Sequence, residues 1–308
     1  MTTITKGFID SSDILNDPEA LRARAAEEGY LFLRQLLPQD IVLELRRQML
    51  EVLNHFGWLY PDAPLMDGIG NQKAIEAIPR EELVFCGTGV PRPAYEAVQK
   101  LELFHALAHH PNLIAMYEKL FDAPVLPHPR NIARLMMPAK NNVPTPPHQD
   151  YIHIQGTKNV WTCWFPVGDC PIEMGNLSII RGSHKEGLLM PKAAEGAGGL
   201  EVWLCEDHYE WLEENYEAGD VLTFTSETVH KSLPSQMPDR VRLSCDYRFQ
   251  PAHEDIEEKS LKVHCDVLPW DEVYQGWENE ALKYYWKNND LKLSPWNEDI
   301  RWQKEKIC

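Results

Sequence analysis

The sequence predicts a mainly β fold with flanking helices, in which short strands build a sandwich or a barrel such as a double-stranded β-helix (jelly roll). Two observations support this. From about residue 130 onward, short apolar runs alternate with turn residues, a spacing typical of sandwiches and barrels rather than of alternating βαβ units. Roughly the first 125 residues contain instead longer runs of helix formers, which predict helices.

The N-terminal part is predicted to be helical with one early strand. A run of helix formers over 18–28, ended by Gly29, predicts a helix, and the apolar run 30–33 predicts a strand. Apolar residues at helical spacing then predict a second helix over 39–57.

Residues 61–93 are rich in Pro, Gly and Asp and are predicted to form a long irregular segment. Segments of this length in compact domains are often functional lids. Two further helices are expected over 94–109 and 111–121, the second ending before the Asp-Ala-Pro at 122–124.

The expected strands of the core are apolar runs bounded by turn signals. The acidic stretch 206–217 is expected to be a short helix or a loop. The runs predicted as strands are 132–137, 160–167, 177–180, 200–204, 221–225 and 241–249.

The chain is expected to be a single domain over 1–308, because it contains no internal repeat and no low-complexity linker. We expect a helical part to about residue 125 and a jelly-roll core over about 126–250. A C-terminal extension over about 251–308 follows. Five of the ten tryptophans lie beyond residue 269, so this extension should pack on something, either the sheet's outer face or a second subunit.

The formal net charge of the chain is −17, from 30 basic and 47 acidic residues. This charge repels polyanions, so it argues against nucleic acid or an anionic membrane as a partner, although it permits a locally basic pocket. A small-molecule substrate is therefore the expected partner, and the chain is expected to be a monomer or a homodimer.

The seven cysteines are widely spaced and include no Cys-x-x-Cys pair. This usage is typical of reduced intracellular cysteines rather than of a disulfide framework. The sequence also lacks an apolar signal core near its start and any apolar run approaching the ~20 residues of a membrane span. We therefore expect a cytoplasmic protein.

Residues 144–152, Pro-Thr-Pro-Pro-His-Gln-Asp-Tyr-Ile, carry the central motif. Residues i and i+2 of an extended chain point to the same side, so the His148 imidazole and the Asp150 carboxylate can converge on one ion. One nitrogen and one oxygen ligand are two-thirds of the 2-His-1-carboxylate triad that holds non-haem Fe(II). The His-x-Asp pattern recurs twice more, at His253/Asp255 and His264/Asp266.

A second histidine is needed to complete the triad. In a jelly roll the third ligand arrives several strands after the first two, roughly 50–100 residues later. His230 lies 80 residues after Asp150 and follows a turn and buried strand predicted over 218–225. The two C-terminal His-x-Asp pairs have no histidine at that distance after them, and His153 is too near to arrive on another strand. The sequence therefore favours His148, Asp150 and His230.

The run 240–249, which begins ten residues after His230, alternates between polar residues at even positions and apolar residues at odd positions. Its polar face lies either in water or inside a barrel whose outer face is covered by helices. In the second case an arginine there would clamp an anion, because a guanidinium pairs bidentately with a carboxylate. The alternation alone leaves both interpretations open.

Four blocks of residues stand out together. They are His148-Gln149-Asp150, the stretch 164–185 with its Gly-Asn-Leu and Arg-Gly-Ser-His-Lys, the stretch 219–232, and Arg240 with its strand. In combination they resemble the phytanoyl-CoA dioxygenase-like family of Fe(II)/2-oxoglutarate oxygenases. The resemblance extends from about residue 20 to 250 and leaves the C-terminal tail uncovered.

The resemblance implies Fe(II) as the metal, with His148, Asp150 and His230 as its ligands, and 2-oxoglutarate and O2 as co-substrates. Related halogenases lack a carboxylate at the position of Asp150, so its presence favours hydroxylation, desaturation or ring-forming oxidation over halogenation. The sequence does not separate these three reactions, of which we expect hydroxylation. Succinate and carbon dioxide would be formed in each case.

The resemblance also implies a co-substrate site. Arg240, helped by Ser232, would bind the distal carboxylate of 2-oxoglutarate, and we favour it over Arg242 because its distance to the following Ser-Cys pair matches the family. Trp164 would lie close to the co-substrate. Arg134, on the strand before the Pro-rich loop, is a further co-substrate candidate.

The substrate is less well defined by the sequence. If Arg242 and Arg248 face inward, a small polar or carboxylate-bearing metabolite or natural-product intermediate is expected. Tyr151, His153 and Phe165 are candidates to line its pocket, and the irregular segment 61–93 to cap it.

Two rival functions remain open at this point. A metal-dependent non-redox enzyme on a cupin-like barrel would use the same triad but would give no reason for Arg240 and Ser232. A non-catalytic binding protein of the same fold would not need an intact triad and clamp.

Overall fold

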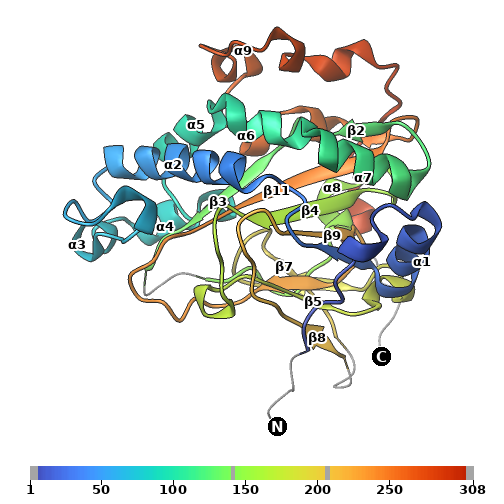
Figure 1. Cartoon of the computed structure of the whole chain (residues 1–308), viewed down its shortest axis with the longest axis horizontal. Helices are drawn as coiled ribbons and strands as arrows, with labels where there is room; N and C mark the ends of the chain where they lie inside the picture. The colour runs from blue at the N-terminus through green and yellow to red at the C-terminus, as the bar shows by residue number, and fades with distance from the viewer. Residues whose placement is uncertain (1–5, 140–142, 205–208, 303–308) are drawn as a thin grey trace.

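The computed structural model describes residues 6–139, 143–204 and 209–302, and two antiparallel sheets that face each other form its core (Figure 1). The larger sheet has the order β1-β9-β4-β11-β2, with β3 also paired to β11, and the smaller has the order β10-β5-β8. Apolar side chains of β4 and β9 in the larger sheet pack against those of β5 and β8 in the smaller. The fold is therefore mainly β, as predicted.

Every strand predicted from the sequence is present, although some of the ends are shifted. The additional strands have only two or three residues, too few for a recognisable alternation. The strands are β1 (Tyr30–Leu33), β2 (Val125–Pro127), β3 (Ile132–Met136), β4 (Trp161–Pro166), β5 (Leu177–Ile180), β6 (Pro191–Ala193), β7 (Leu200–Val202), β8 (Trp211–Leu212), β9 (Val221–Thr225), β10 (His230–Ser232), β11 (Arg242–Pro251), β12 (Ile256–Glu257) and β13 (Leu293–Ser294).

Strand β11 is buried along its whole length, which decides between the two interpretations of its alternation. Its apolar residues belong to the hydrophobic cluster that the sheet shares with the helices, where Tyr117 of α7 stacks on Phe249 at 4.1 Å between ring centroids. The polar residues, including Arg242, Arg248 and the fully buried Ser244, therefore face the interior of the barrel.

Helices cover the outer face of the larger sheet (Figure 1). The longer helices begin at predictable signals, such as the Asp17 side chain that accepts a hydrogen bond from the Ala20 N–H at the start of α1. The helices are α1 (Pro18–Glu28), α2 (Gln39–His55), α3 (Gln72–Ile75), α4 (Arg80–Leu83), α5 (Arg92–Gln99), α6 (Glu102–Ala106), α7 (Pro111–Phe121), α8 (Tyr151–Ile154) and α9 (Trp270–Val273). Short 3₁₀ turns complete them, among them η3 (Phe85–Gly87), η4 (Leu107–His109), η7 (Glu258–Leu261), η8 (His264–Asp266) and η11 (Glu298–Trp302).

The predicted helix over 94–109 is interrupted, because Leu101 adopts an extended conformation between α5 and α6. Carbonyl groups freed at this break find side-chain partners from elsewhere in the chain. The Lys100 carbonyl accepts a hydrogen bond from Trp277 Nε1 at 2.9 Å, and the Gln99 carbonyl lies 3.0 Å from His105 Nε2. The break depends on long-range contacts that local periodicity does not encode.

Two further predictions need correction. The acidic stretch 206–217 was predicted as a helix or loop, but β8 lies within it and pairs with β5, while residues 206–208 are outside the described part of the chain. The tryptophan-rich extension packs on the helices that cover the sheet: Trp277 donates to the Lys100 carbonyl and its ring lies 5.1 Å from that of His105. Within the described ranges, no helix has the length and apolar character needed to cross a membrane.

The expectation of cysteines without a disulfide is wrong for one pair. Cys86 and Cys265 form a disulfide across a sequence separation of 179 residues, with a Cα–Cα distance of 6.5 Å. Cys163, Cys170 and Cys245 are free and buried. The bond ties η3 to η8, two segments that sequence spacing gave no reason to pair.

Replacing both Cys86 and Cys265 by serine should lower the free energy of unfolding by about 2–4 kcal/mol, because the unfolded chain would regain the freedom that a long closed loop removes. Denaturant unfolding with and without reductant measures this, and reductant should not change the double variant. Titration of seven thiols in the unfolded wild type without reductant, instead of five, would contradict the disulfide.

Candidate metal and co-substrate site

The side chains of His148, Asp150 and His230 converge inside the barrel. Asp150 Oδ1 lies 3.6 Å from His148 Nε2 and 3.8 Å from His230 Nε2, and all three ligand atoms are within 4.8 Å of one another. In the part of the chain that the structure describes, this is the only cluster of three or more His, Cys, Asp or Glu with such geometry. Two imidazole nitrogens and one carboxylate suit a divalent iron ion with open coordination positions.

The two histidines are brought together by the backbone, despite a separation of 82 residues in sequence. His148 N–H donates to the His230 carbonyl at 2.9 Å, and His230 N–H donates to the His148 carbonyl at 3.0 Å. This reciprocal pair is an antiparallel bridge, which places both side chains on one side. Asp150 follows two residues later and precedes α8 (Figure 1).

Hydrogen bonds fix the orientation of each ring. Nδ1 of His148 lies 2.8 Å from the Pro146 carbonyl, and Nδ1 of His230 lies 3.1 Å from the Thr228 carbonyl. Because a carbonyl only accepts, each Nδ1 carries the proton and each Nε2 presents its lone pair to the centre. The rings are thus in the tautomer that binds a metal.

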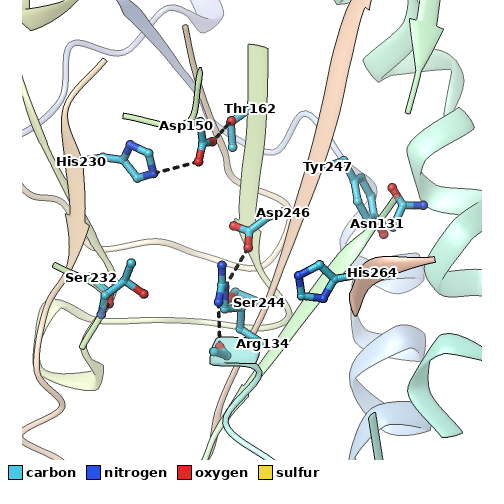
Figure 2. A network of polar contacts seen from close by, with 12 residues as sticks. Asn131, Arg134, Asp150, Thr162, His230, Ser232, Ser244, Asp246, Tyr247 and His264 are labelled. Atoms are coloured by element: carbon cyan, nitrogen blue, oxygen red, sulfur yellow. Dashed lines mark hydrogen bonds and ion pairs between the residues drawn. The ribbon is translucent and has the colours of Figure 1, made fainter. Parts of the chain in front are cut away.

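Two further side chains hold the Asp150 carboxylate, and Figure 2 shows one of them, Thr162. Asp150 Oδ2 lies 3.0 Å from the Arg248 guanidinium and accepts a hydrogen bond from the Thr162 hydroxyl, which leaves Oδ1 toward the histidines. Burial opposes ionisation of Asp150, but the adjacent Arg248 guanidinium favours the charged form, and the pKa of this carboxyl is well below its ordinary value. Burial and the neighbouring His148 lower the pKa of His230 to about 3, so that ring is neutral at pH 7.

A cavity of about 360 Å³, which we call the triad cavity, is lined by His148 and Asp150. Arg134 and Arg248 contribute to it from the larger sheet, and the Cys86–Cys265 disulfide lies along its wall. Arg134 donates to Asp246 Oδ2 at 3.0 Å and to the Gly87 carbonyl at 2.7 Å, so its charge is already paired (Figure 2).

A second cavity, of about 710 Å³, lies next to the first and is lined by Ser232, Arg240 and Arg242. The Ser232 hydroxyl accepts a hydrogen bond from the Thr145 N–H at 2.6 Å, and Thr145 itself lines the triad cavity. The Thr145–Ser232 hydrogen bond thus joins a residue of one cavity lining to a residue of the other.

The two candidate clamps differ sharply in environment. Arg240 is only partly buried, lies just before β11 and donates to the Asp67 carbonyl at 3.0 Å. Arg242 is 5% exposed on the interior face of β11 and donates to the Ser244 hydroxyl at 2.9 Å. Among the described residues, no carboxylate forms an ion pair with Arg242. The buried Arg242 charge therefore carries a desolvation cost that a bound anion would offset.

Of the predicted substrate and co-substrate residues Phe165, Trp164, Tyr151 and His153, only His153 lines one of the two cavities. Phe165 does not line the substrate pocket as predicted, because the parity of β4 turns it outward, where it packs on Tyr247. Trp164 faces inward but is packed in the core edge-on to Tyr216, and it lines neither cavity. Tyr151 also lines neither, whereas His153 lies in the triad cavity, and burial lowers its pKa to about 3.

Several residues of the triad cavity were not singled out from the sequence. His264, which was set aside as a metal ligand, does not join the triad but lines this cavity and lies 2.7 Å from the Tyr95 hydroxyl. Four more of them are Arg130, Lys259, Trp296 and Arg301. Three of these four come from the C-terminal extension, a region that the resemblance did not cover.

Residues 25–241 match the phytanoyl-CoA dioxygenase (PhyH) family. This match spans well over half of the chain. The chain belongs to the phytanoyl-CoA dioxygenase family. The resemblance stated from the four sequence blocks is thereby confirmed, and with it the enzyme class, an Fe(II)/2-oxoglutarate-dependent oxygenase.

Relatives within and around the family agree with this assignment. The 1-deoxypentalenic acid 11-beta-hydroxylase of Streptomyces arenae is 30% identical over 293 residues, covering 88% of this chain and 93% of that enzyme. The enzyme of the same name from Streptomyces exfoliatus is 28% identical over 287 residues, with the same coverage of each chain.

Solved structures confirm the fold. The epimerase SnoN, in complex with Fe3+, alpha ketoglutarate and nogalamycin RO, has a TM-score of 0.55 at 20% identity, over 78% of this chain and 86% of that one. EvdO2 from Micromonospora carbonacea var. aurantiaca, complexed with 2-oxoglutarate, has a TM-score of 0.53 at 17% identity, over 80% and 93%. The fold expected from the sequence is therefore the fold that these solved structures share with this chain.

His230→Ala should weaken Fe(II) binding by more than about 100-fold, since loss of a ligand exceeds the 10–100-fold effect of losing a residue that only orients one. Anaerobic titration calorimetry measures this. His253→Ala, at an exposed His-x-Asp histidine, is the matched control and should bind Fe(II) as the wild type does. Equal losses in both variants would contradict the assignment of the triad.

Proposed function

We propose that this protein is a hydroxylase that oxidises a C–H bond of a small natural-product-type intermediate, using Fe(II), 2-oxoglutarate and O2. The observation that carries the proposal is the convergence of His148, Asp150 and His230 next to a substrate-sized cavity. The sequence relatives support it, since both are named as hydroxylases of an acid.

In this proposal the three triad residues hold the metal, and Arg248 and Thr162 keep the Asp150 carboxylate oriented. Iron with 2-oxoglutarate and O2 would place one oxygen atom on the substrate and the other in succinate, with release of carbon dioxide. The chain contributes the placement of the ligands and a cavity of about 360 Å³ beside them.

We propose Arg242, rather than the Arg240 that the resemblance favours, as the clamp for the distal carboxylate of 2-oxoglutarate, with Ser232 beside it. Arg242 is buried without an ion-pair partner among the described residues, whereas Arg240 is partly exposed and bound to the backbone of Asp67. Arg134 is less suited, because Asp246 already neutralises it. Trp164 is assigned no direct contact.

The proposed location is the cytoplasm, and the proposed state is a monomer or homodimer. The buried free cysteines agree with a reducing compartment, whereas the Cys86–Cys265 bond is unusual there.

The whole proposal is tested by adding 2-oxoglutarate to the Fe(II)-loaded protein without oxygen. A visible charge-transfer band should form, and succinate should appear when O2 is admitted. His230→Ala should abolish both. Absence of the band and of succinate in the wild type would leave a non-redox metal enzyme or a binding protein as the function.

Arg242→Gln should raise the Kd for 2-oxoglutarate by ~10–100-fold, the value expected for one bidentate guanidinium–carboxylate pair. Titration of the charge-transfer band measures this. Arg240→Gln is the matched control and should change the Kd less than about threefold. The opposite order of effects would restore Arg240 as the clamp.

A further inference from the structure

The triad cavity carries an excess of positive charge. Five cationic side chains line it, and Asp150 is the only acidic residue among its lining residues. The cations are Arg130, Arg134, Arg248, Lys259 and Arg301. The chain as a whole has a formal net charge of −17, so this concentration runs against its overall composition.

Two of the five cations are neutralised by buried carboxylates. Arg134 pairs with Asp246 at 3.0 Å, and Arg248 pairs with Asp150, also at 3.0 Å. Both pairs lie on the larger sheet and belong to the architecture of the metal site, so neither guanidinium is available for a ligand.

The other three cations form no ion pair with a described residue, although the buried Glu257 carboxylate is near enough to Arg130 and Lys259 to interact with them electrostatically. Arg130, in the loop between β2 and β3, is partly buried and makes neither a hydrogen bond nor an ion pair with any described residue. Lys259 Nζ lies 4.1 Å from the centroid of the Trp296 ring, and Arg301 Cζ lies 6.0 Å from it. Nε of Arg301 is buried without a hydrogen-bond partner in the described chain.

An arginine remains ionised even where burial disfavours it, so a half-buried guanidinium that no carboxylate contacts directly is costly unless an anion binds it. His128, His153 and His264 add no charge to the cavity, because burial lowers their pKa values and keeps them neutral. The remaining lining includes Ile132, Ile154 and Ala197, which suits an apolar body beside the charged group.

We propose that Arg130, with Lys259 and Arg301 of the C-terminal extension, binds a carboxylate of the substrate. The substrate is then a compact, largely apolar organic acid, oriented with its charged end on these three residues and its body toward the triad. The extension is thereby a wall of the substrate site. This inference rests on the proposed function for the identity of the reaction, but not for the anion site itself.

The test compares two ligands that differ only in charge, adamantane-1-carboxylate and adamantane-1-carboxamide. Calorimetry is done anaerobically on protein saturated with Fe(II) and 2-oxoglutarate, so that the metal and the co-substrate clamp are occupied. The wild type should bind the acid at least ~10-fold more tightly than the amide. Arg130→Gln should remove this preference, and Lys259→Gln with Arg301→Gln should reduce it ~3–10-fold.

Arg47→Gln, at an exposed arginine paired with Glu44 and Glu51, is the control and should keep the preference. An unchanged charge-transfer band and an unchanged Kd for 2-oxoglutarate in Arg130→Gln should show that the variant is folded. No preference in the wild type, or full preference in Arg130→Gln, would overturn the inference. A loss of 2-oxoglutarate binding in Arg130→Gln would overturn it as well, by assigning Arg130 to the co-substrate.

The experiment also distinguishes failure of the anion site from failure of the proposed function. If the wild type forms no charge-transfer band, the same calorimetry on the metal-free protein still measures the acid-over-amide preference and its dependence on Arg130.

Discussion

The site depends on two backbone hydrogen bonds, those that His148 and His230 exchange across an antiparallel bridge. A narrow bridge of this kind fixes the relative position of two side chains more firmly than loop packing does. The positions of the other residues of the site follow from this bridge. Asp150 is placed by its spacing from His148, Arg248 and Thr162 are aimed at Asp150, and Ser232 lies two residues beyond His230.

The sequence predicted this centre because its signals are local or topological. The spacing of His148 and Asp150 follows from strand geometry, and the distance to His230 follows from the number of strands a jelly roll needs. The alternation over 240–249 correctly divided β11 into two faces. It did not say which arginine is buried, because Arg240 and Arg242 share a parity and only the start of the strand separates them.

The residues that the sequence did not single out depend on tertiary contacts. Arg130 lies in a short loop, and Lys259 and Arg301 lie in turns without periodicity, so nothing local marks them as neighbours of the metal site. The break at Leu101 and the Cys86–Cys265 bond likewise depend on segments far apart in the chain. The position of Phe165 follows from local parity alone: it lies on the opposite face of β4 from Thr162, and so outside the barrel.

The Cys86–Cys265 bond turns residues 86–265 into a covalent ring. The ring contains all three triad residues and every strand of the two main sheets except β1. A single protease cut anywhere within it therefore opens the ring without separating the pieces, whereas the segments before Cys86 and after Cys265 are arms that can be cut away. The three triad residues therefore stay covalently linked to one another after any single cut in the chain.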